Sequence, residues 1–330
     1  MIGEPPGAGG AGPRTRDTLR RVKTVLVTGG AGFIGSHLAN DVLAHGERCI
    51  VLDDLSTGKR ENVPPGAVFH QRDINDPGLD ELLADERVDV VNHHAAQANV
   101  RVSLEDPAAD ARVNVLGGLA LVAACRKAGV KRFVFASSGG TVYGEQEVFP
   151  CGEEHPKRPV SPYGVAKYAF ELYLEVFARA GDLEPVALRY ANVYGPRQWP
   201  KGEAGIVAIL AETLLAGERP KIFGDGGQTR DYVHVDDVVA ANRAAYTTDR
   251  LGAYNVGTGV ETTVNALYRR VARELGSAIQ PLHVAAIPGE LRRNSLAAGK
   301  LARELGVRVA TGLDQGLAAT LAWYRARAAA

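Results

Sequence analysis

The chain has 330 residues, enough for one large α/β domain or for two lobes around an ample hydrophobic core. Hydrophobic residues make up 45% and charged residues 23% of the sequence, which excludes a disordered or collagen-like chain. Lysine plus arginine and aspartate plus glutamate both number 38, so the net charge is zero and gives no general reason to expect nucleic acid or an anionic membrane as a partner.

Three features of the sequence bear on where the protein works. Residues 1–20 contain glycine, proline and arginine but no apolar segment typical of a secretory signal, so we expect a flexible tail there. The longest apolar stretch, about 113–125, is interrupted by an asparagine and two glycines and is too short to cross a membrane. Cys49, Cys125 and Cys151 lack the spacing of zinc ligands or of a redox pair. These features predict a cytoplasmic protein with reduced thiols.

Short apolar runs alternate with longer helical patterns through the first half of the chain. The predicted strands lie at 23–28, 48–52, 67–70, 88–92, 132–136 and 185–189. The predicted helices lie at 33–44, 77–84, 107–128 and 162–180. This order predicts an α/β fold, with a Rossmann-type doubly wound parallel sheet over residues 21–190.

The pattern changes after residue 190, where loops rich in glycine and proline replace the regular alternation. We therefore expect a smaller C-terminal α/β lobe over 191–330 that binds the substrate. The segment at about 231–256 is expected to return to the first domain.

A glycine-rich loop joins the first predicted strand to the first predicted helix. Gly29, Gly32 and Gly35 would allow a tight turn, close approach of the backbone to a pyrophosphate and close helix–strand packing. Asp53, at the end of the second strand, can accept hydrogen bonds from both ribose hydroxyls of adenosine. Its negative charge would repel the 2′-phosphate of NADP, although the two basic residues that could attract such a phosphate follow closely, at 59–60. The pattern predicts NAD rather than NADP as the cofactor.

A tyrosine and a lysine four residues apart suggest the chemistry. Tyr163 and Lys167 share one face of a predicted helix, where the lysine ammonium and an oxidised nicotinamide would favour the phenolate and make the tyrosine a base. The helix follows a strand that ends with Ser137 and Ser138, at the edge of the sheet where α/β proteins bind ligands. We assign Ser138 as the hydroxyl that bonds the reacting oxygen, with Ser137 as the alternative.

Adjacent histidines follow the fourth predicted strand. His93 and His94 would point to opposite faces, so they cannot bind one metal ion together, and we expect no metal site.

Longer stretches of the sequence resemble a known family. The chain is similar to NAD-dependent nucleotide-sugar epimerases of the extended short-chain dehydrogenase/reductase family, most of all to UDP-glucose 4-epimerases, over about residues 22–306. The strings that carry the resemblance are TGGAGFIGSHL, LDDLSTGKREN, HHAAQANVRVS, FASSGGTVYGE, SPYGVAKYAFE, RYANVYGPRQ, GEAGIVAIL and GDGGQTRDYVHVDDV. The resemblance implies that NAD stays bound while the sugar C4 hydroxyl is oxidised to a ketone, the keto sugar turns over, and hydride returns to the opposite face. It also implies a role in galactose metabolism and a homodimer paired through helices 107–128 and 162–180.

The resemblance assigns residues to the cofactor. Asp53 and Asp54 would hold the adenosine ribose, Asp73 and Ile74 would bracket the adenine, and Asn114 would support the site. Ala98 replaces a lysine that close relatives place over the nicotinamide ribose. The expected cofactor contacts are Gly29, Gly32, Phe33, Ile34, Gly35, Asp53, Asp54, Leu55, Ser56, Thr57, Gly58, Asp73, Ile74, His94, Ala95, Ala96, Asn114, Tyr163, Lys167, Tyr190 and Ala191.

The resemblance also assigns residues to a UDP-sugar. Arg230 would clamp the diphosphate, because a planar guanidinium can bond two oxygens at once. Asn192 would also contact the diphosphate, and Lys221 and Phe223 would flank the uracil. A second family arginine is replaced by Ile287, and Arg292 or Arg293 would have to substitute for it. The expected substrate contacts are Ser138, Thr141, Tyr163, Asn192, Gly205, Ile206, Lys221, Phe223, Arg230, Glu290 and Asn294.

Asn294 falls where family members specific for glucose and galactose carry a tyrosine. Its smaller side chain would leave room for an N-acetyl group on C2 of the sugar, so we expect UDP-N-acetylglucosamine to be a substrate as well as UDP-glucose. The alternative is that Asn294 is a turn residue and that Arg293 fills the space.

Other functions on the same fold remain as alternatives. A dTDP-glucose 4,6-dehydratase would carry an Asp-Glu pair after the catalytic hydroxyl, where this chain has Gly139 and Gly140. A UDP-glucuronate 4-epimerase or decarboxylase would need donors for a C6 carboxylate, and none is assigned. A non-enzymatic NAD-sensing protein would be expected to have lost Tyr163 or Lys167.

Overall fold

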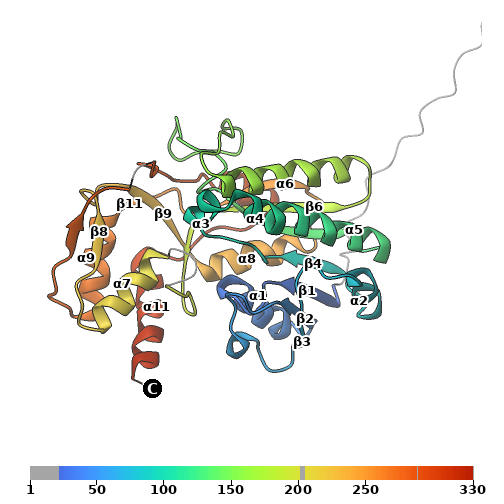
Figure 1. Cartoon of the computed structure of the whole chain (residues 1–330), viewed down its shortest axis with the longest axis horizontal. Coiled ribbons are helices and arrows are strands. Elements are labelled where there is room, and N and C mark those ends of the chain that lie inside the picture. The colour runs from blue at the N-terminus through green and yellow to red at the C-terminus, as the bar shows by residue number, and fades with distance from the viewer. Residues whose placement is uncertain (1–21, 201–204, 288, 330) are drawn as a thin grey trace, which may run out of the picture.

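The computed structural model describes residues 22–200, 205–287 and 289–329 (Figure 1). The tail expected at 1–20 lies outside the described residues. Seven strands form one sheet in the order β10-β6-β5-β4-β1-β2-β3, with every neighbouring pair parallel. They are β1 (Thr24–Thr28), β2 (Arg48–Asp53), β3 (Val68–Gln71), β4 (Val90–His93), β5 (Arg132–Ser138), β6 (Glu184–Tyr190) and β10 (Gly252–Val256).

Helices cover both faces of this sheet, which is why its central strands are continuous apolar runs. One face packs on α1 (Phe33–Ala44) and α8 (Val235–Ala245), and the other on α2 (Leu79–Asp85), α5 (Gly118–Ala128) and α6 (Pro162–Arg179). The doubly wound fold class predicted from the sequence is confirmed. All six predicted strands are present, and β10 comes from the segment expected to return to this domain.

The stretch predicted as one helix over 107–128 is divided. It consists of α4 (Pro107–Ala111), a π-helical segment η2 (Arg112–Gly117) and α5. This stretch is long and apolar enough to cross a membrane, unlike the shorter run expected from the sequence. Its buried residues, such as Leu121 and Cys125, belong to the core beneath the sheet. Length and composition are therefore weak evidence for a membrane span here, because core helices pass the same test.

The C-terminal lobe is built on small sheets. One has the order β11-β9-β7, and β12 pairs with β8 in another. Three helices enclose a separate apolar core beside them. The elements are β7 (Asn192–Tyr194), α7 (Ile206–Leu215), β8 (Lys221–Phe223), β9 (Thr229–His234), β11 (Glu261–Thr263), α9 (Val264–Leu275), β12 (Leu282–Val284) and α11 (Leu313–Ala328).

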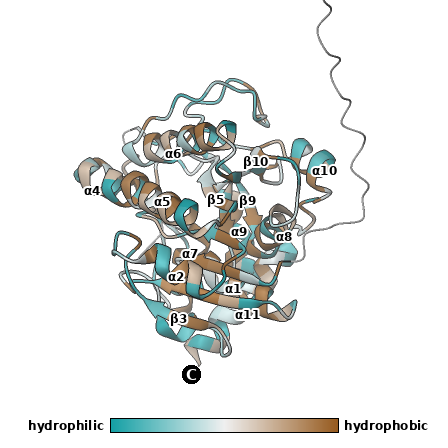
Figure 2. Ribbon diagram, turned by 90° about the vertical axis from the view of Figure 1, so that its right-hand side faces the viewer, coloured by the Kyte–Doolittle hydropathy of each residue, from teal (hydrophilic) through white to brown (hydrophobic). Residues whose placement is uncertain are grey.

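Short elements link or flank the two parts. They are η1 (Arg60–Asn62), α3 (Val100–Glu105) and α10 (Gly299–Leu305). In Figure 1, α3 lies at the end of the first domain that faces the lobe containing β8 and β9. Figure 2 shows apolar residues along both α5 and α6, which cover one face of the main sheet.

Candidate active site

The glycine loop leaves no room for side chains at the start of α1. Gly29 has a φ of +67°, and a Cβ there would lie 2.7 Å from the backbone nitrogen of Ala95. A Cβ on Gly35 would collide with the carbonyl oxygen of Gly29. Gly32 precedes the helix, so the first amides of α1 are available as donors at its N-terminus. This cradle fits a pyrophosphate.

Asp53 ends β2 with a buried carboxylate. Its Oδ2 accepts from the amide of Ala31 (2.9 Å) and its Oδ1 from the amide of Leu55 (2.8 Å). Burial raises the pKa of the carboxyl group, and the two amides oppose that shift. Each oxygen retains a lone pair for a ribose hydroxyl. Neighbouring Asp54 is exposed, and its Oδ1 accepts from the amide (2.9 Å) and hydroxyl (2.7 Å) of Ser56.

The residues expected around adenine lie after β3. Asp73 accepts from the amide (2.7 Å) and side chain (2.8 Å) of Asn75, which fixes the turn. Ile74 is buried, and its Cδ1 lies 2.6 Å from where a Cβ on Gly117 would be. Ile74 thus packs on the π-helical segment.

The histidines at the end of β4 lie on opposite faces of the sheet, as predicted. His93 contacts the rings of Phe135 and Phe170 and pairs with the hydroxyl of Thr28 (2.8 Å). His94 stacks on Tyr190, with 3.0 Å between its Nε2 and the phenol oxygen. Burial lowers the pKa of His94 to about 3, so its ring is neutral at physiological pH. Among the residues that the structure describes, no cluster of three or more His, Cys, Asp or Glu could hold a metal ion.

Asn114 lies in the π-helical segment and is almost fully buried. Its Nδ2 donates to the carbonyl oxygen of Gln97 (2.8 Å) and to Asp110 (2.9 Å). Within the described chain, its Oδ1 has no hydrogen-bond partner. Because π-bulges often occur at functional sites, this irregular turn is consistent with the expected role of Asn114 in supporting the site.

Tyr163 and Lys167 lie at the start of α6. Ser161 caps the helix by accepting from the amide of Gly164 (3.2 Å), and a proline occupies the first turn. The Lys167 ammonium is buried and lies 5.6 Å from the ring centroid of Tyr163. The amide of Tyr163 donates to Ser103 on α3 (3.2 Å).

The two serines at the end of β5 have different surroundings. Ser137 is buried and donates to Glu171 of α6. Ser138 is half-buried and pairs in register with Tyr190 of β6. Both serines belong to the strand, so their side chains alternate between its faces. The hydroxyl of nearby Thr141 is buried and has no partner in the described part of the chain.

Glu171 also anchors a buried polar network that sequence reasoning missed. It forms an ion pair with Arg189 of β6, with both side chains at most 4% exposed. Arg189 donates to the hydroxyl of Tyr143 (2.9 Å), which donates to Asn255 on β10 (2.6 Å). The position of Glu171, four residues after Lys167, was the available signal that it shares a helix face with Tyr163 and Lys167.

The arginines considered for the substrate diphosphate form ion pairs with carboxylates. Arg230 pairs with Glu290 at 2.9 Å. Arg292 forms two 2.9 Å bonds to Asp225. Arg293 forms an ion pair with Glu261.

The remaining predicted substrate residues are spread over the lobe and its border. Asn192 is half-buried at the start of β7, and Gly205 directly precedes α7, which begins with Ile206. Lys221 is exposed and Phe223 half-buried at the two ends of β8.

Asn294 is 1% exposed and lies beside the end of β5. Its Nδ2 lies 3.4 Å from the carbonyl oxygen of Gly139. Its Oδ1 has no hydrogen-bond partner in the described ranges. The side chain is therefore buried rather than part of an exposed turn.

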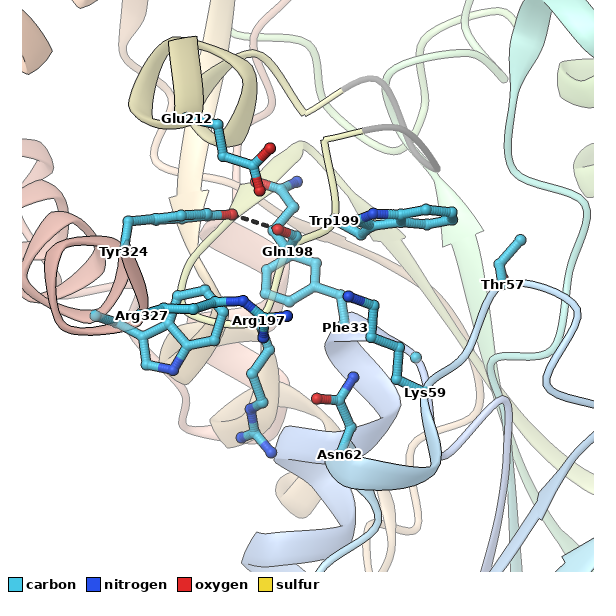
Figure 3. Close-up of a pocket in the computed structure, with 12 residues that line it drawn as sticks. Phe33, Thr57, Lys59, Asn62, Arg197, Gln198, Trp199, Glu212, Tyr324 and Arg327 are labelled. Carbon is cyan, nitrogen blue, oxygen red and sulfur yellow. Dashed lines mark hydrogen bonds between the residues drawn. The ribbon is translucent and has the colours of Figure 1, made fainter. Parts of the chain in front are cut away.

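A cleft opens beside the start of α1, between the two parts of the chain (Figure 3). Lys59 lies over the ring of Trp199, with 5.6 Å between the ammonium and the ring centroid. On the far side, the hydroxyl of Tyr324 in α11 donates to the carbonyl oxygen of Gln198. Neither Tyr163 nor Lys167 is among the lining residues, so this cleft adjoins the glycine loop without containing the predicted catalytic residues.

The model of the NAD dependent epimerase/dehydratase family matches residues 25–257. The chain belongs to this family. The family inferred from the sequence strings, its enzymatic character and NAD as its cofactor are thereby confirmed.

Individual relatives cover nearly the whole chain. It is 45% identical over 306 residues to a UDP-glucose 4-epimerase of Mycolicibacterium smegmatis, covering 91% of this chain and 98% of that one. A UDP-glucose 4-epimerase of Thermotoga maritima, solved with UDP-glucose, has a TM-score of 0.90 and 45% identity, covering 92% and 99% of the two chains. The Thermus thermophilus UDP-glucose 4-epimerase, solved with NAD, has a TM-score of 0.87 and 47% identity, with coverage of 92% and 99%.

Proposed function

We propose that this protein interconverts UDP-glucose and UDP-galactose by NAD-dependent epimerisation at C4 of the sugar. The observation that carries the proposal is the arrangement at the carboxyl end of β5, where Ser138 lies opposite Tyr190 and the neighbouring helix α6 presents Tyr163 with Lys167. The glycine cradle and the buried Asp53 carboxylate fit the pyrophosphate and the ribose of NAD. Bound NAD would supply the acceptor that takes hydride from C4 and returns it.

The protein side chains would move and hold the proton of the C4 hydroxyl. Tyr163 Oη removes this proton and gives it back, while the positive charge of Lys167 stabilises the phenolate. Ser138 donates a hydrogen bond to the same sugar oxygen and keeps it oriented. The oxygen is thus held by two hydroxyl groups while the rest of the sugar turns.

The cofactor and substrate contacts expected from the sequence form part of the same proposal. Glycine-loop residues and Asp53 would hold the dinucleotide. Arg230 and Asn192 would hold the substrate diphosphate, with Phe223 against the base. Because Arg230 already pairs with Glu290, the diphosphate would have to share this guanidinium or displace the glutamate.

A 4,6-dehydratase is less compatible with the strand end. Gly139 follows the proposed catalytic serine, and a Cβ there would collide with Leu296. A carboxylate at this position would need the side chain of Leu296 to move. Elimination requires an acid and a base at that place, so an epimerase fits better than a dehydratase.

We also propose a cytoplasmic homodimer that acts in galactose metabolism and does not depend on nucleic acid or membrane. Exposed apolar side chains support the dimer, since Leu172, Tyr173 and Val176 of α6 and Leu116 of η2 are 44–59% exposed. The three cysteines are buried free thiols, in keeping with a reducing compartment.

The decisive experiment is turnover of UDP-glucose by the purified protein. Proton NMR would follow the anomeric signal of UDP-galactose as it appears. Release of a 4-keto-6-deoxy sugar nucleotide would instead identify a dehydratase.

A further inference from the structure

One arginine next to the proposed substrate site, Arg101, lies on the border between the two parts of the chain. Arg101 is the second residue of α3, and its guanidinium carbon lies 5.5 Å from the ring centroid of Phe223. α3 belongs to the cofactor-binding domain, whereas Phe223 ends β8 of the other lobe. The contact therefore places a positive charge where the two parts of the chain meet.

The other candidate cations already have partners. Arg230 pairs with Glu290, and Arg292 binds Asp225 through two bonds. In the described part of the chain, no carboxylate lies within ion-pair distance of Arg101. Its amide donates to the Asn99 side chain at 2.9 Å, so the backbone that carries the guanidinium is fixed by the helix cap.

The position of α3 indicates which part of a nucleotide sugar would meet this charge. Ser103, two residues after Arg101, accepts from the backbone amide of Tyr163, so α3 also contacts the helix that acts on the sugar. The Arg101 guanidinium contacts Phe223, the residue proposed to lie against the base. In a nucleoside diphosphate sugar, the diphosphate links these two ends. A cation between them is therefore placed to bind phosphate oxygens.

We propose that Arg101 supplies a second guanidinium to the diphosphate of the nucleotide-sugar substrate. The inference rests on the proposed function for the class of ligand. Arg101 would thus take over the charge that Ile287 cannot provide. Arginine suits this task because its planar fork can bond two phosphate oxygens and still stack on an aromatic ring.

Calorimetric titration of the NAD-loaded protein with UDP and with uridine tests the proposal. Arg101→Ala should weaken UDP binding by about 10- to 100-fold and change uridine binding by less than about twofold, because only UDP carries the diphosphate. Arg101→Lys should recover part of the loss. UDP binding should also depend less steeply on salt in Arg101→Ala than in the wild type.

Arg308→Ala is the matched control, since it removes an exposed guanidinium from the loop between α10 and α11, outside the proposed substrate contacts, and should change neither affinity. Equal weakening of UDP and uridine in Arg101→Ala, or no weakening of UDP, would overturn the inference, as would a wild-type protein that does not bind UDP. Epimerisation is measured separately on the wild type. A protein that binds UDP through Arg101 but does not epimerise UDP-glucose would contradict the proposed function alone.

Discussion

The hydroxyl groups of Tyr163 and Ser138 are proposed to act on the same oxygen of the substrate. Tyr163→Phe should lower kcat by about 100- to 10,000-fold, because it removes the group that transfers the proton. NAD binding should be weakened far less, because the glycine loop and Asp53 remain and the backbone contact to Ser103 does not use the phenol. Ser138→Ala should cost about 10- to 1000-fold, the range for one lost hydrogen bond to developing charge. Steady-state kinetics and the NAD content of the denatured protein provide the two measurements.

Ser137→Ala is the control for these variants. Ser137 is directed at Glu171 inside the molecule, so its loss should reduce stability more than turnover. If Ser137→Ala were the more damaging change for kcat and Ser138→Ala were mild, the assignment of the two serines would be reversed.

The size and burial of the Asn294 side chain predict which nucleotide sugars the protein accepts as substrates. The side chain is buried beside β5, its oxygen has no hydrogen-bond partner among the described residues, and it is smaller than a tyrosine. We expect the wild type to epimerise UDP-N-acetylglucosamine as well as UDP-glucose, and Asn294→Tyr to suppress the first reaction selectively. Parallel NMR assays of both substrates measure this ratio. A wild type that converts UDP-glucose rapidly but leaves millimolar UDP-N-acetylglucosamine unchanged would contradict the assignment.

At the scale of elements, the Glu171–Arg189 pair connects helix α6 to strand β6 of the main sheet. Removing one partner leaves the other charge buried, so Glu171→Gln should lower the free energy of unfolding by about 3–5 kcal/mol. The double variant Glu171→Met with Arg189→Met should be less destabilised than Glu171→Gln. Urea unfolding of the three proteins measures the difference.

A surface pair offers the comparison. Glu147 and Arg158 are both largely exposed, so Glu147→Gln should cost less than about 1 kcal/mol. Equal costs for Glu147→Gln and Glu171→Gln would show that the buried pair does not hold α6 in place.

The elements also show what the sequence could and could not predict. Strands that are buried on both faces of a sheet appear in the sequence as continuous apolar runs. The main sheet was therefore predictable. The division of helix 107–128 was not, because the π-helical turn carries a contact from Asn114 to the backbone of Gln97, 17 residues earlier, that helical periodicity does not show. The Arg101–Phe223 contact was also hidden, since it joins two lobes.

At the scale of the whole molecule, the exposed apolar residues of α6 predict a homodimer. Val176→Lys combined with Leu172→Lys should convert the protein to a monomer, because burying two ammonium groups in a helical interface is costly. Light scattering at micromolar concentration measures the mass. Leu282→Lys, on β12 in the other lobe, is a matched control that should leave the dimer intact. A wild type that is monomeric under these conditions would contradict the prediction.

The most direct test of the whole account is proton NMR of the purified protein with UDP-glucose and no added cofactor. If the hydride removed from C4 is returned within the same turnover, NAD that copurifies with the protein is sufficient for catalysis. We predict that the anomeric signal of UDP-galactose grows to an equilibrium mixture without net formation of NADH. A protein that needs added NAD and accumulates NADH, or that leaves UDP-glucose unchanged while its NAD site is filled, would contradict this account.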